Sequence, residues 1–238
     1  DEKQLSEAFV ELEQLTGIGS VKKEITELVN LVRFYREVGK EVVNKFSLHT
    51  AFLGNPGTGK TTVARILAKI FKALGILERG HLVECDRQTL VAGYVGQTAI
   101  KTAEKIDEAL GGVLFIDEAY ALSSRQGNDF GNEAIETLIK RMEDQKGEFI
   151  VVVAGYTDNM KLFLEANPGL KSRFDRMLNF DDFSPTELYE IAENGLRKEQ
   201  YSLTEAAQQH LQQYCAYLFE TKDRYFGNGR TIIKMAHE

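Results

Sequence analysis

The stretch GNPGTGKTT, at residues 54–62, has the composition and spacing of a phosphate-binding loop. It fits the pattern G-x-x-x-x-G-K-[ST] in full from Gly54 to Thr61. Glycines let the backbone curl until several N–H groups face one concavity, and a following helix directs the positive end of its dipole there. Lys60 can then reach the β- and γ-phosphates, and the Thr61 hydroxyl can ligate Mg²⁺. The pattern predicts nucleotide contacts from Asn55, Pro56, Gly57, Thr58, Gly59, Lys60, Thr61 and Thr62.

A second set of candidate residues stands at the end of an apolar run. Residues 113–120 read VLFIDEAY, and the acidic pair is Asp117-Glu118. A carboxylate at the end of a buried strand beside a phosphate loop can hold Mg²⁺ through water, which is the role predicted for Asp117. Glu118 is then placed to orient and deprotonate an attacking water. Alone, the pair could be two solvated carboxylates; with the phosphate loop upstream, it favours hydrolysis of ATP.

Both sets of residues require strands that end at one edge of a sheet. Apolar runs at 48–53, 81–85, 112–116, 149–154 and 177–180 alternate with helical patterns, one of which passes through Ile100, Ala103 and Ile106. Unbroken apolar runs are typical of strands buried on both faces, so the sequence predicts an α/β fold with a parallel sheet sandwiched by helices. A glycine-rich turn can match the loop pattern by chance, but this strand–loop–helix context favours a true phosphate loop.

The pattern changes near residues 181–184. Ser184-Pro185-Thr186-Glu187 combines an N-cap, a proline at the first helical position and a capping-box glutamate, and only helical patterns follow. We therefore predict an α/β nucleotide-binding domain over residues 1–181, whose first 40 residues form a helical segment, and a small α-helical lid domain over residues 182–238. Because the chain starts at Asp1 and stops within a helical pattern, we expect a fragment with an incomplete lid.

The composition argues against nucleic acid, a zinc ion and a membrane as binding partners. The 238 residues carry a formal net charge of -7, which argues against non-specific binding of nucleic acid. Two distant cysteines, Cys85 and Cys215, suggest neither a disulfide framework nor a zinc site. No signal peptide or membrane-spanning run is recognisable, so we expect a cytoplasmic protein without a membrane partner.

Taken together, the motifs resemble those of the AAA+ ATPases across nearly the whole chain. Within that family the sequence is most similar to the group of red-type Rubisco activases and stage V sporulation protein K. The stretches that carry this resemblance are GNPGTGKTTVAR, GHLVECDRQTLVAGYVGQTA, GGVLFIDEAY, VVVAGYTDNM, NPGLKSRF and GNGRTI. The resemblance implies a P-loop NTPase domain with a helical lid, ATP and Mg²⁺ as ligands, and assembly into a ring, most often a hexamer.

The resemblance also implies roles for residues outside the two motifs. In LTGIGSVKKEI (15–25), Gly17 and Ile18 correspond to residues that line the adenine pocket. Arg230 of the sequence GNGR resembles the second sensor, which reaches from the lid to the γ-phosphate. Arg173, with Arg176 as the alternative, lies in a segment that supplies an arginine finger to the neighbouring subunit, where it stabilises transition-state charge.

The first sensor is harder to assign. In AAA+ proteins a polar residue, often Asn, follows the strand that corresponds here to FIVVVAG (149–155) and positions the lytic water. This chain has Tyr156-Thr157-Asp158 instead and so departs from that pattern. Thr157 is the assignment that we favour, and Tyr156 is its rival.

The loop LVAGYVGQTA (90–99) carries an aromatic–hydrophobic pair, Tyr94 and Val95, between two glycines. In AAA+ rings the corresponding loop faces the central pore and grips a polypeptide; an aromatic ring can contact any side chain without sequence-specific hydrogen bonds. The alternative is a tyrosine packed under a neighbouring loop. The polar segment 123–133 is a second candidate pore loop.

We therefore expect an AAA+ ATPase that hydrolyses ATP between the subunits of a ring, with chaperone-like remodelling of a protein client whose identity the sequence does not reveal. Two other functions remain open: an ATP-dependent assembly switch or scaffold that threads nothing, and a DNA-acting AAA+ protein, which the acidic composition opposes. The Asp117-Glu118 pair and the helical lid oppose a metabolic P-loop kinase.

Overall fold

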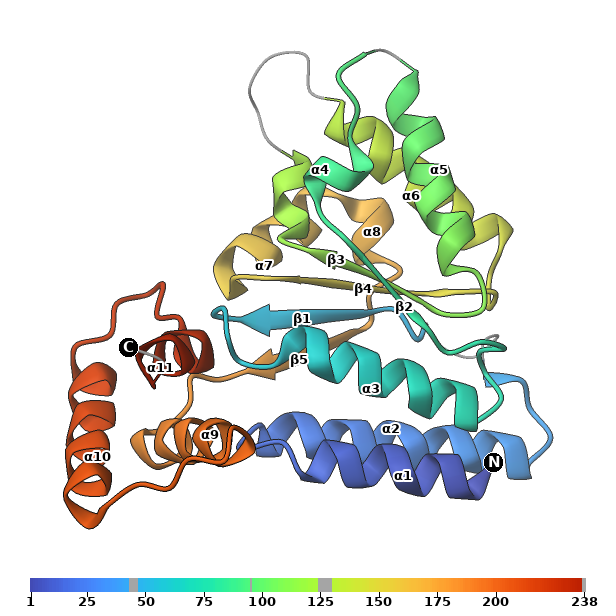
Figure 1. Ribbon diagram of the computed structural model, residues 1–238. Helices are drawn as coiled ribbons and strands as arrows, with labels where there is room; N and C mark the ends of the chain where they lie inside the picture. Colours follow the sequence, from blue (N-terminus) through green and yellow to red (C-terminus); the bar gives the residue numbers. More distant parts are fainter. Residues whose placement is uncertain (43–46, 95, 124–129, 237–238) are drawn as a thin grey trace.

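A parallel β-sheet forms the centre of the computed structural model, which describes residues 1–42, 47–94, 96–123 and 130–236 (Figure 1). Its strands are β1 (Thr50–Gly54), β2 (Leu82–Cys85), β3 (Val113–Asp117), β4 (Ile150–Gly155) and β5 (Arg176–Phe180). The strand order is β2-β3-β4-β1-β5, and every neighbouring pair is parallel. The carboxyl ends of β1, β3 and β4 therefore meet at one edge of the sheet.

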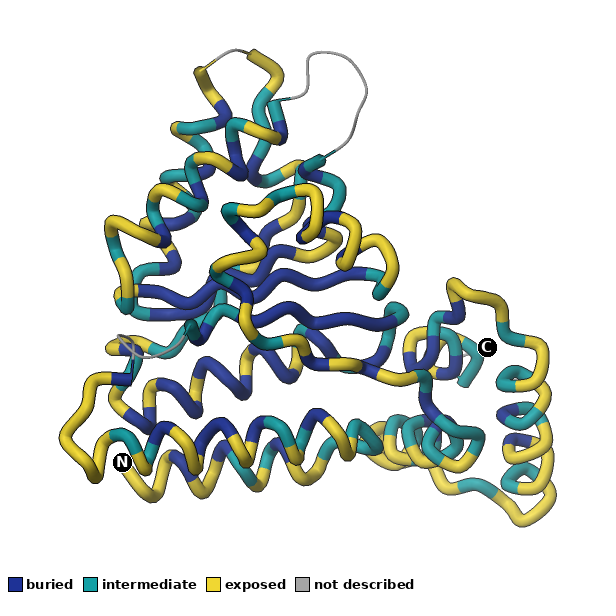
Figure 2. The backbone as a smooth tube through the Cα atoms, turned by 180° about the vertical axis from the view of Figure 1, so that it is seen from behind, coloured by how far each residue is buried: buried dark blue, intermediate teal, exposed yellow. Residues whose placement is uncertain are grey.

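Helices cover both faces of the sheet. On one face lie α1 (Glu2–Glu13), α2 (Gly19–Glu37) and α3 (Lys60–Ala73). The other face carries α4 (Arg87–Leu90), α5 (Gln97–Ala109), the 3₁₀ helix η2 (Ala119–Ser123), α6 (Gly131–Asp144), α7 (Thr157–Ala166) and α8 (Pro168–Lys171). Successive strand residues alternate between the two layers: Phe52 joins the core under α1–α3, whereas Ala51 and Leu53 join the core under α5–α7. This burial on both faces explains the unbroken apolar runs (Figure 2).

A helical lid follows the last strand. It consists of α9 (Pro185–Lys198), α10 (Glu205–Glu220) and α11 (Asn228–Ala236), which lie beside the strand ends in Figure 1. The predicted capping box is present: the Ser184 side chain accepts from the Glu187 backbone N–H, and the Glu187 carboxylate accepts from that of Ser184. The lid has a small core of its own, centred on Leu188, Cys215 and Ile232.

The predicted fold class is confirmed, and the strands begin within two residues of their predicted starts. The helix predicted through Ile100, Ala103 and Ile106 is α5, but its buried face is not that trio. Ile100 is 62% exposed, and Thr98 and Thr102 are buried in its place because their hydroxyls are hydrogen-bonded to the preceding loop. Among the described residues, no helix is long and apolar enough to cross a bilayer.

Candidate functional site

The predicted phosphate loop and acidic pair line one cavity at the carboxyl edge of the sheet. This cavity measures about 230 Å³. It is bounded by Gly54, Pro56, Gly57, Gly59, Lys60, Thr61, Thr62, Asp117, Glu118, Gly155, Tyr156 and Arg230. The residues come from β1, α3, β3, β4 and the lid helix α11, so the parallel topology gathers them from distant parts of the sequence.

The loop itself depends on glycine at two positions. Gly57 and Gly59 have φ values of +72° and +95°, which other residues rarely adopt. Lys60 begins α3 and is 9% exposed; its Nζ donates to the backbone oxygens of Gly54 at 2.8 Å and Asn55 at 2.6 Å. Burial lowers the pKa of Lys60 to about 8, although the nearby Asp117 carboxylate opposes that shift. The ammonium group is thus held at the mouth of the loop, where phosphate oxygens can accept from it.

The acidic pair has an unusual backbone. Glu118 has a φ of +48°, and its N–H donates to the Asp117 carboxylate at 3.0 Å. Thr61 and Asp117 line the same cavity, and hydroxyl and carboxylate oxygens are ligands that Mg²⁺ accepts. No cluster of three or more His, Cys, Asp or Glu residues with metal-binding geometry occurs in the described ranges. The donors of Thr61 and Asp117, one hydroxyl and one carboxylate, fit a Mg²⁺ ion that is bound mainly by nucleotide phosphates and water, as is usual for this ion.

A larger, more apolar cavity of about 760 Å³ lies on the other side of the loop, and Gly57, Gly59, Thr62 and Arg230 line both cavities. Its apolar walls suit a nucleotide base. They come from Leu15, Ile18, Phe183, Ile191, Gly195 and Ile233.

Of the two residues expected at adenine, Ile18 lines this cavity. Gly17 is not among its lining residues. A side chain at Gly17 would collide with the carboxylate of Glu187, because a Cβ there would lie 2.0 Å from Oε2.

Three residues with left-handed backbones surround the two cavities. In the described part of the chain, Ile18, Glu118, Gln200 and Asn228 are the non-glycine residues with positive φ. Ile18 and Glu118 line the cavities, and Asn228 precedes two residues that line the larger one, Gly229 and Arg230. Such conformations cost about 1–3 kcal/mol each and gather at functional sites, where the surrounding structure maintains them.

The structure separates the two candidates for the first sensor. Tyr156 follows β4 and lines the phosphate cavity, whereas Thr157 is the first residue of α7 and is not among the lining residues. The geometry thus favours Tyr156 over the predicted Thr157. The Tyr156 ring lies between those of Tyr120, at a centroid distance of 6.4 Å, and Tyr225 of the lid, at 5.5 Å.

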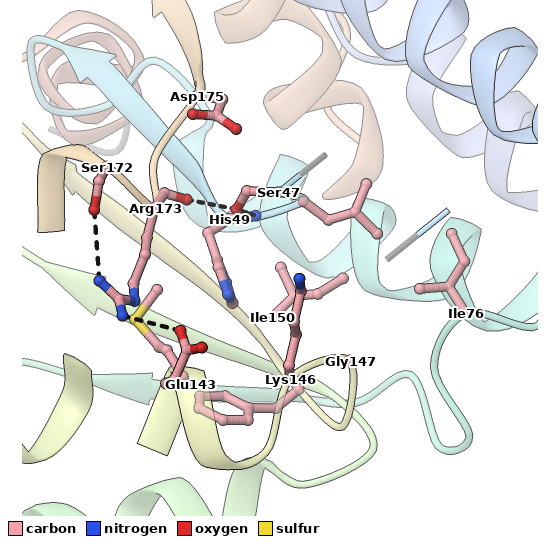
Figure 3. A pocket seen from close by; sticks show the side chains of 13 residues that line it. Ser47, His49, Ile76, Glu143, Lys146, Gly147, Ile150, Ser172, Arg173 and Asp175 are labelled. Atoms are coloured by element: carbon pink, nitrogen blue, oxygen red, sulfur yellow. Dashed lines mark hydrogen bonds and ion pairs between the residues drawn. The ribbon is translucent and has the colours of Figure 1, made fainter. Parts of the chain in front are cut away.

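Arg173 lies at the opposite, amino edge of the sheet, just before β5. It borders a cavity of about 340 Å³ whose other walls include His49, Glu143, Lys146 and Ser172 (Figure 3). Its guanidinium donates to the Glu143 carboxylate at 3.0 Å and to the Gly169 oxygen at 2.8 Å. Arg173 therefore takes no part in the phosphate cavity of its own chain. The alternative residue, Arg176, begins β5 and is half-buried.

The Tyr94 loop projects from the sheet and is anchored at its base. The Ala92 N–H donates to the Thr98 hydroxyl at 2.9 Å, and the Thr102 hydroxyl donates to the Leu90 oxygen at 3.0 Å. Tyr94 is 73% exposed, which excludes the alternative of a packed tyrosine within this chain. Val95 lies outside the described residues, as does most of the second candidate loop, residues 124–129.

Two polar residues at the site were not selected from the sequence. Asp182 and Asn228 hydrogen-bond to each other and to the phosphate loop. Asn228 stands between two glycines in GNGR, and that setting could have suggested a left-handed residue. For Asp182 the sequence offers no such signal.

Family models and known proteins match most of the chain. Residues 50–182 match the ATPase family associated with various cellular activities (AAA), and residues 184–238 match the AAA lid domain. Stage V sporulation protein K of Bacillus subtilis is 43% identical over 96% of this chain and 72% of its own length. The chloroplastic ribulose bisphosphate carboxylase/oxygenase activase of Cyanidioschyzon merolae is 41% identical, over 96% and 79%. The ESX-1 secretion system protein EccA1 of Mycobacterium tuberculosis is 45% identical over 89% of this chain but 38% of its own length.

Solved structures with the same fold are more distant in sequence. The AAA domain of FIGL-1, in complex with ADP, superposes with a TM-score of 0.64 at 20% identity, covering 94% of this chain and 70% of that one. A mutant of RuvB from Thermotoga maritima gives a TM-score of 0.63 at 22% identity, covering 95% and 63%. These likenesses concern the fold alone.

Proposed function

The chain belongs to the AAA family of ATPases, and we propose that it hydrolyses Mg²⁺-bound ATP between the subunits of a ring and uses the energy to remodel a protein client. The single observation that carries the hydrolytic part is the shared cavity, in which the phosphate loop, the acidic pair and a lid arginine face one another. We also propose residues 1–181 and 182–238 as its two domains.

Each residue of the cavity has a distinct task in this proposal. The backbone of residues 55–59 and the Lys60 ammonium bind the phosphates, and the apolar cavity beside Ile18 takes the adenine. Thr61 and Asp117 hold Mg²⁺, which when bound neutralises charge on the β- and γ-phosphates. Glu118 orients a water and accepts its proton, while Tyr156 and Arg230 contact the γ-phosphate. The transfer of a phosphoryl group to water requires little covalent chemistry from the protein. Catalysis therefore depends on the position of the attacking water and on stabilisation of the charge in the transition state.

Ring assembly is proposed because the residue that we assign as arginine finger, Arg173, does not line the phosphate cavity of its own chain. Arg173 lies at the sheet edge opposite the phosphate loop, a position that supports a role at the nucleotide of a neighbouring subunit. A head-to-tail contact would bring the amino edge of the sheet in one subunit to the carboxyl edge of the sheet in the next. Such contacts form a closed ring when the rotation between successive subunits adds up to a full turn, and we propose a hexamer.

A protein client is favoured by the exposed Tyr94 at the tip of an anchored loop. The relative from Cyanidioschyzon merolae is named as an activase of ribulose bisphosphate carboxylase/oxygenase. The target in that name is a protein, which supports a protein client for this chain. Clustering of this loop at a pore would let Tyr94 grip an extended chain of varied sequence.

The first test is ATP hydrolysis per subunit measured against protein concentration, for wild type and Arg173→Ala. A site completed in trans gives a rate per subunit that rises with concentration and collapses in the variant. Lys171→Ala, at an exposed basic neighbour, is the matched control and keeps the wild-type profile. A rate independent of both concentration and Arg173 would overturn the ring.

Mixing two inactive variants sharpens this test. Arg173→Ala subunits retain Glu118, and Glu118→Gln subunits retain Arg173. Random mixing in a ring pairs an intact Glu118 with an intact neighbouring Arg173 at roughly a quarter of the interfaces. Turnover should therefore reappear in the mixture. A mixture as inactive as its components would contradict the assignment of Arg173.

A further inference from the structure

The side chain of Asn228 joins three parts of the chain. It is fully buried at the start of α11. Its Oδ1 accepts from the Phe183 N–H at 2.8 Å, at the junction between β5 and the lid. Its two amide hydrogens face three acceptors, which are Asp182 Oδ1 at 2.8 Å, the Phe226 oxygen at 3.1 Å and, most distant, the Pro56 oxygen at 3.4 Å. One amide thus links the lid, the junction and the phosphate loop.

Asp182 extends this network from the junction. Besides Asn228, its Oδ1 accepts from the Asn55 side-chain amide at 2.9 Å, and its Oδ2 accepts from Lys222 Nζ, also at 2.9 Å. Burial alone would raise the pKa of Asp182, but the hydrogen bonds from Asn228, Lys222 and Asn55 outweigh burial and hold the pKa below its usual value. The carboxylate is therefore charged when it binds the phosphate loop and the lid together.

The backbones of loop and lid are also in direct contact. The Gly229 N–H donates to the Gly57 oxygen at 3.0 Å. A Cβ at Gly57 would lie 2.1 Å from the Gly227 oxygen, so the lid approaches too closely for any side chain there. Arg230 follows Gly229 directly and lines the cavity that contains Lys60. A shift of the loop against residues 227–229 would therefore move Arg230 as well.

We propose that Asp182 and Asn228 are positioning residues that couple the phosphate loop to the lid and fix Arg230 against the γ-phosphate position. The proposal rests on the proposed role of Arg230, and it adds a physical route by which a change in the loop reaches the lid. A change at residues 55–57 is passed through the buried amide of Asn228 and the carboxylate of Asp182.

A purely structural explanation of Asn228 makes a different prediction. Asn228 has a φ of +48°, and asparagine is among the few residues that tolerate this conformation. If backbone conformation were its whole role, glycine would serve as well, because glycine adopts positive φ without strain. Asn228→Gly therefore separates the two explanations: it keeps the backbone and deletes every side-chain contact.

The experiment compares wild type, Asn228→Gly, Arg230→Ala and the double variant, with kcat and KM for ATP and the Kd for ADP from calorimetry. We expect Asn228→Gly to lower kcat roughly ten- to a hundredfold, because small misplacements of a catalytic group have effects of that size. In the Arg230→Ala background the same substitution should lower kcat no further. A wild-type kcat in Asn228→Gly, or an undiminished loss in the Arg230→Ala background, would overturn the coupling. A wild-type kcat in Arg230→Ala would instead remove the proposed role of Arg230 and this inference with it.

Asp182→Asn provides a second route if the glycine variant unfolds. It keeps the shape of the side chain but removes its charge. Lys222→Met is its matched control, because Lys222 binds Oδ2 of the carboxylate, whereas Asn55 and Asn228 both bind Oδ1. We expect a loss of kcat in Asp182→Asn and a nearly wild-type kcat in Lys222→Met, with thermal unfolding followed in both. An equal loss of kcat in the two variants would show that Asp182 acts only through its ion pair with Lys222, and a wild-type kcat in Asp182→Asn would show that its charge has no role in hydrolysis; either result would overturn the proposal.

Discussion

The ring of Tyr225, in the lid, meets the ring of Tyr156, at the end of β4, edge to face, with the planes at 85° and the centroids 5.5 Å apart. This geometry lies within the favourable range for aromatic pairs. Tyr156 also lines the phosphate cavity, so the lid contacts a residue of this cavity independently of Arg230. The lid therefore contacts Tyr156 through Tyr225, and it contacts the phosphate loop through Asn228 and Gly229.

Tyr156→Phe tests which residue acts as the first sensor. The substitution keeps both ring contacts and removes only the hydroxyl, so stability should not change. Loss of one hydrogen bond to a charged group should lower kcat roughly tenfold or more, with little effect on ADP affinity. Thr157→Val is the comparison, and its kcat should stay near that of wild type. The reverse result, a normal Tyr156→Phe and an impaired Thr157→Val, would restore the assignment that the sequence favoured.

Glu118→Gln removes the proposed base while keeping its size. We expect kcat to fall by about 10²- to 10⁴-fold, since that is the usual contribution of a general base, and ATP binding to persist. The exposed Glu104→Gln provides a matched carboxylate-to-amide control on α5. Rapid-quench measurement of ATP hydrolysis distinguishes chemistry from product release. Turnover at the wild-type rate in Glu118→Gln would assign the base elsewhere.

The phosphate loop and the acidic pair could be predicted because their chemistry is local. Gly54 to Thr61 form the short connection from β1 into α3, and Asp117-Glu118 stand at the end of one buried strand, so spacing along the chain carries the information. The order of the strands could not be read in the same way, but the unbroken apolar runs were enough to predict a parallel sheet covered on both faces.

The contacts between distant segments could not be predicted. Asp182 and Asn55 are 127 residues apart, and their hydrogen bond exists only because β5 lies beside β1. On α5, a helical pattern alone pointed to Ile100, whereas the buried face uses Thr98 and Thr102. A buried threonine looks polar in the sequence, and its satisfied hydroxyl becomes visible only when its partner is in place.

A substitution at Gly195 tests whether the apolar cavity beside Ile18 binds the nucleotide base. Gly195 lies inside α9, where glycine costs a helix about 1 kcal/mol relative to alanine. Apart from its chain neighbours and the adjacent backbone of α9, no atom of the described residues comes within 4 Å of a Cβ built there. The residue lines the apolar cavity, so the space is available to a ligand. We expect Gly195→Leu to weaken ADP binding at least tenfold while leaving the melting temperature equal or higher, with Gly195→Ala as the smaller control. Unchanged ADP affinity in Gly195→Leu would place the base outside this cavity.

We expect the free energy of unfolding to depend on pH through the buried His49. Its Nδ1 accepts from the Val151 N–H at 2.9 Å, and burial, assisted by the charge of Arg173, lowers its pKa from 6.5 to about 4. Between these values the unfolded chain binds a proton that the folded chain does not. The free energy of unfolding contributed by His49 therefore falls as the pH drops from 6.5 to about 4, by no more than roughly 3 kcal/mol.

His49→Asn isolates this term, because the asparagine oxygen can accept the same Val151 N–H without titrating. Urea unfolding of the two proteins should show a stability difference that shifts in favour of the variant as the pH falls through that window. Parallel pH profiles would mean that His49 keeps its ordinary pKa in the folded protein.

We expect substitution of Tyr94 to separate ATP hydrolysis from the unfolding of a polypeptide client. The loop base is fixed by Thr98 and Thr102, and the Tyr94 ring is 73% exposed and does not line the phosphate cavity. Tyr94→Ala should therefore keep the basal kcat and lose the ATP-dependent unfolding of a fluorescently labelled model polypeptide, whereas Tyr94→Phe, which keeps an aromatic ring, should retain it. Tyr201, 64% exposed in the lid, is a matched control, and Tyr201→Ala should behave as wild type in both assays. If Tyr94→Ala unfolds the polypeptide at the wild-type rate, the loop does not grip the client, and an ATP-dependent assembly switch becomes the better account of the protein.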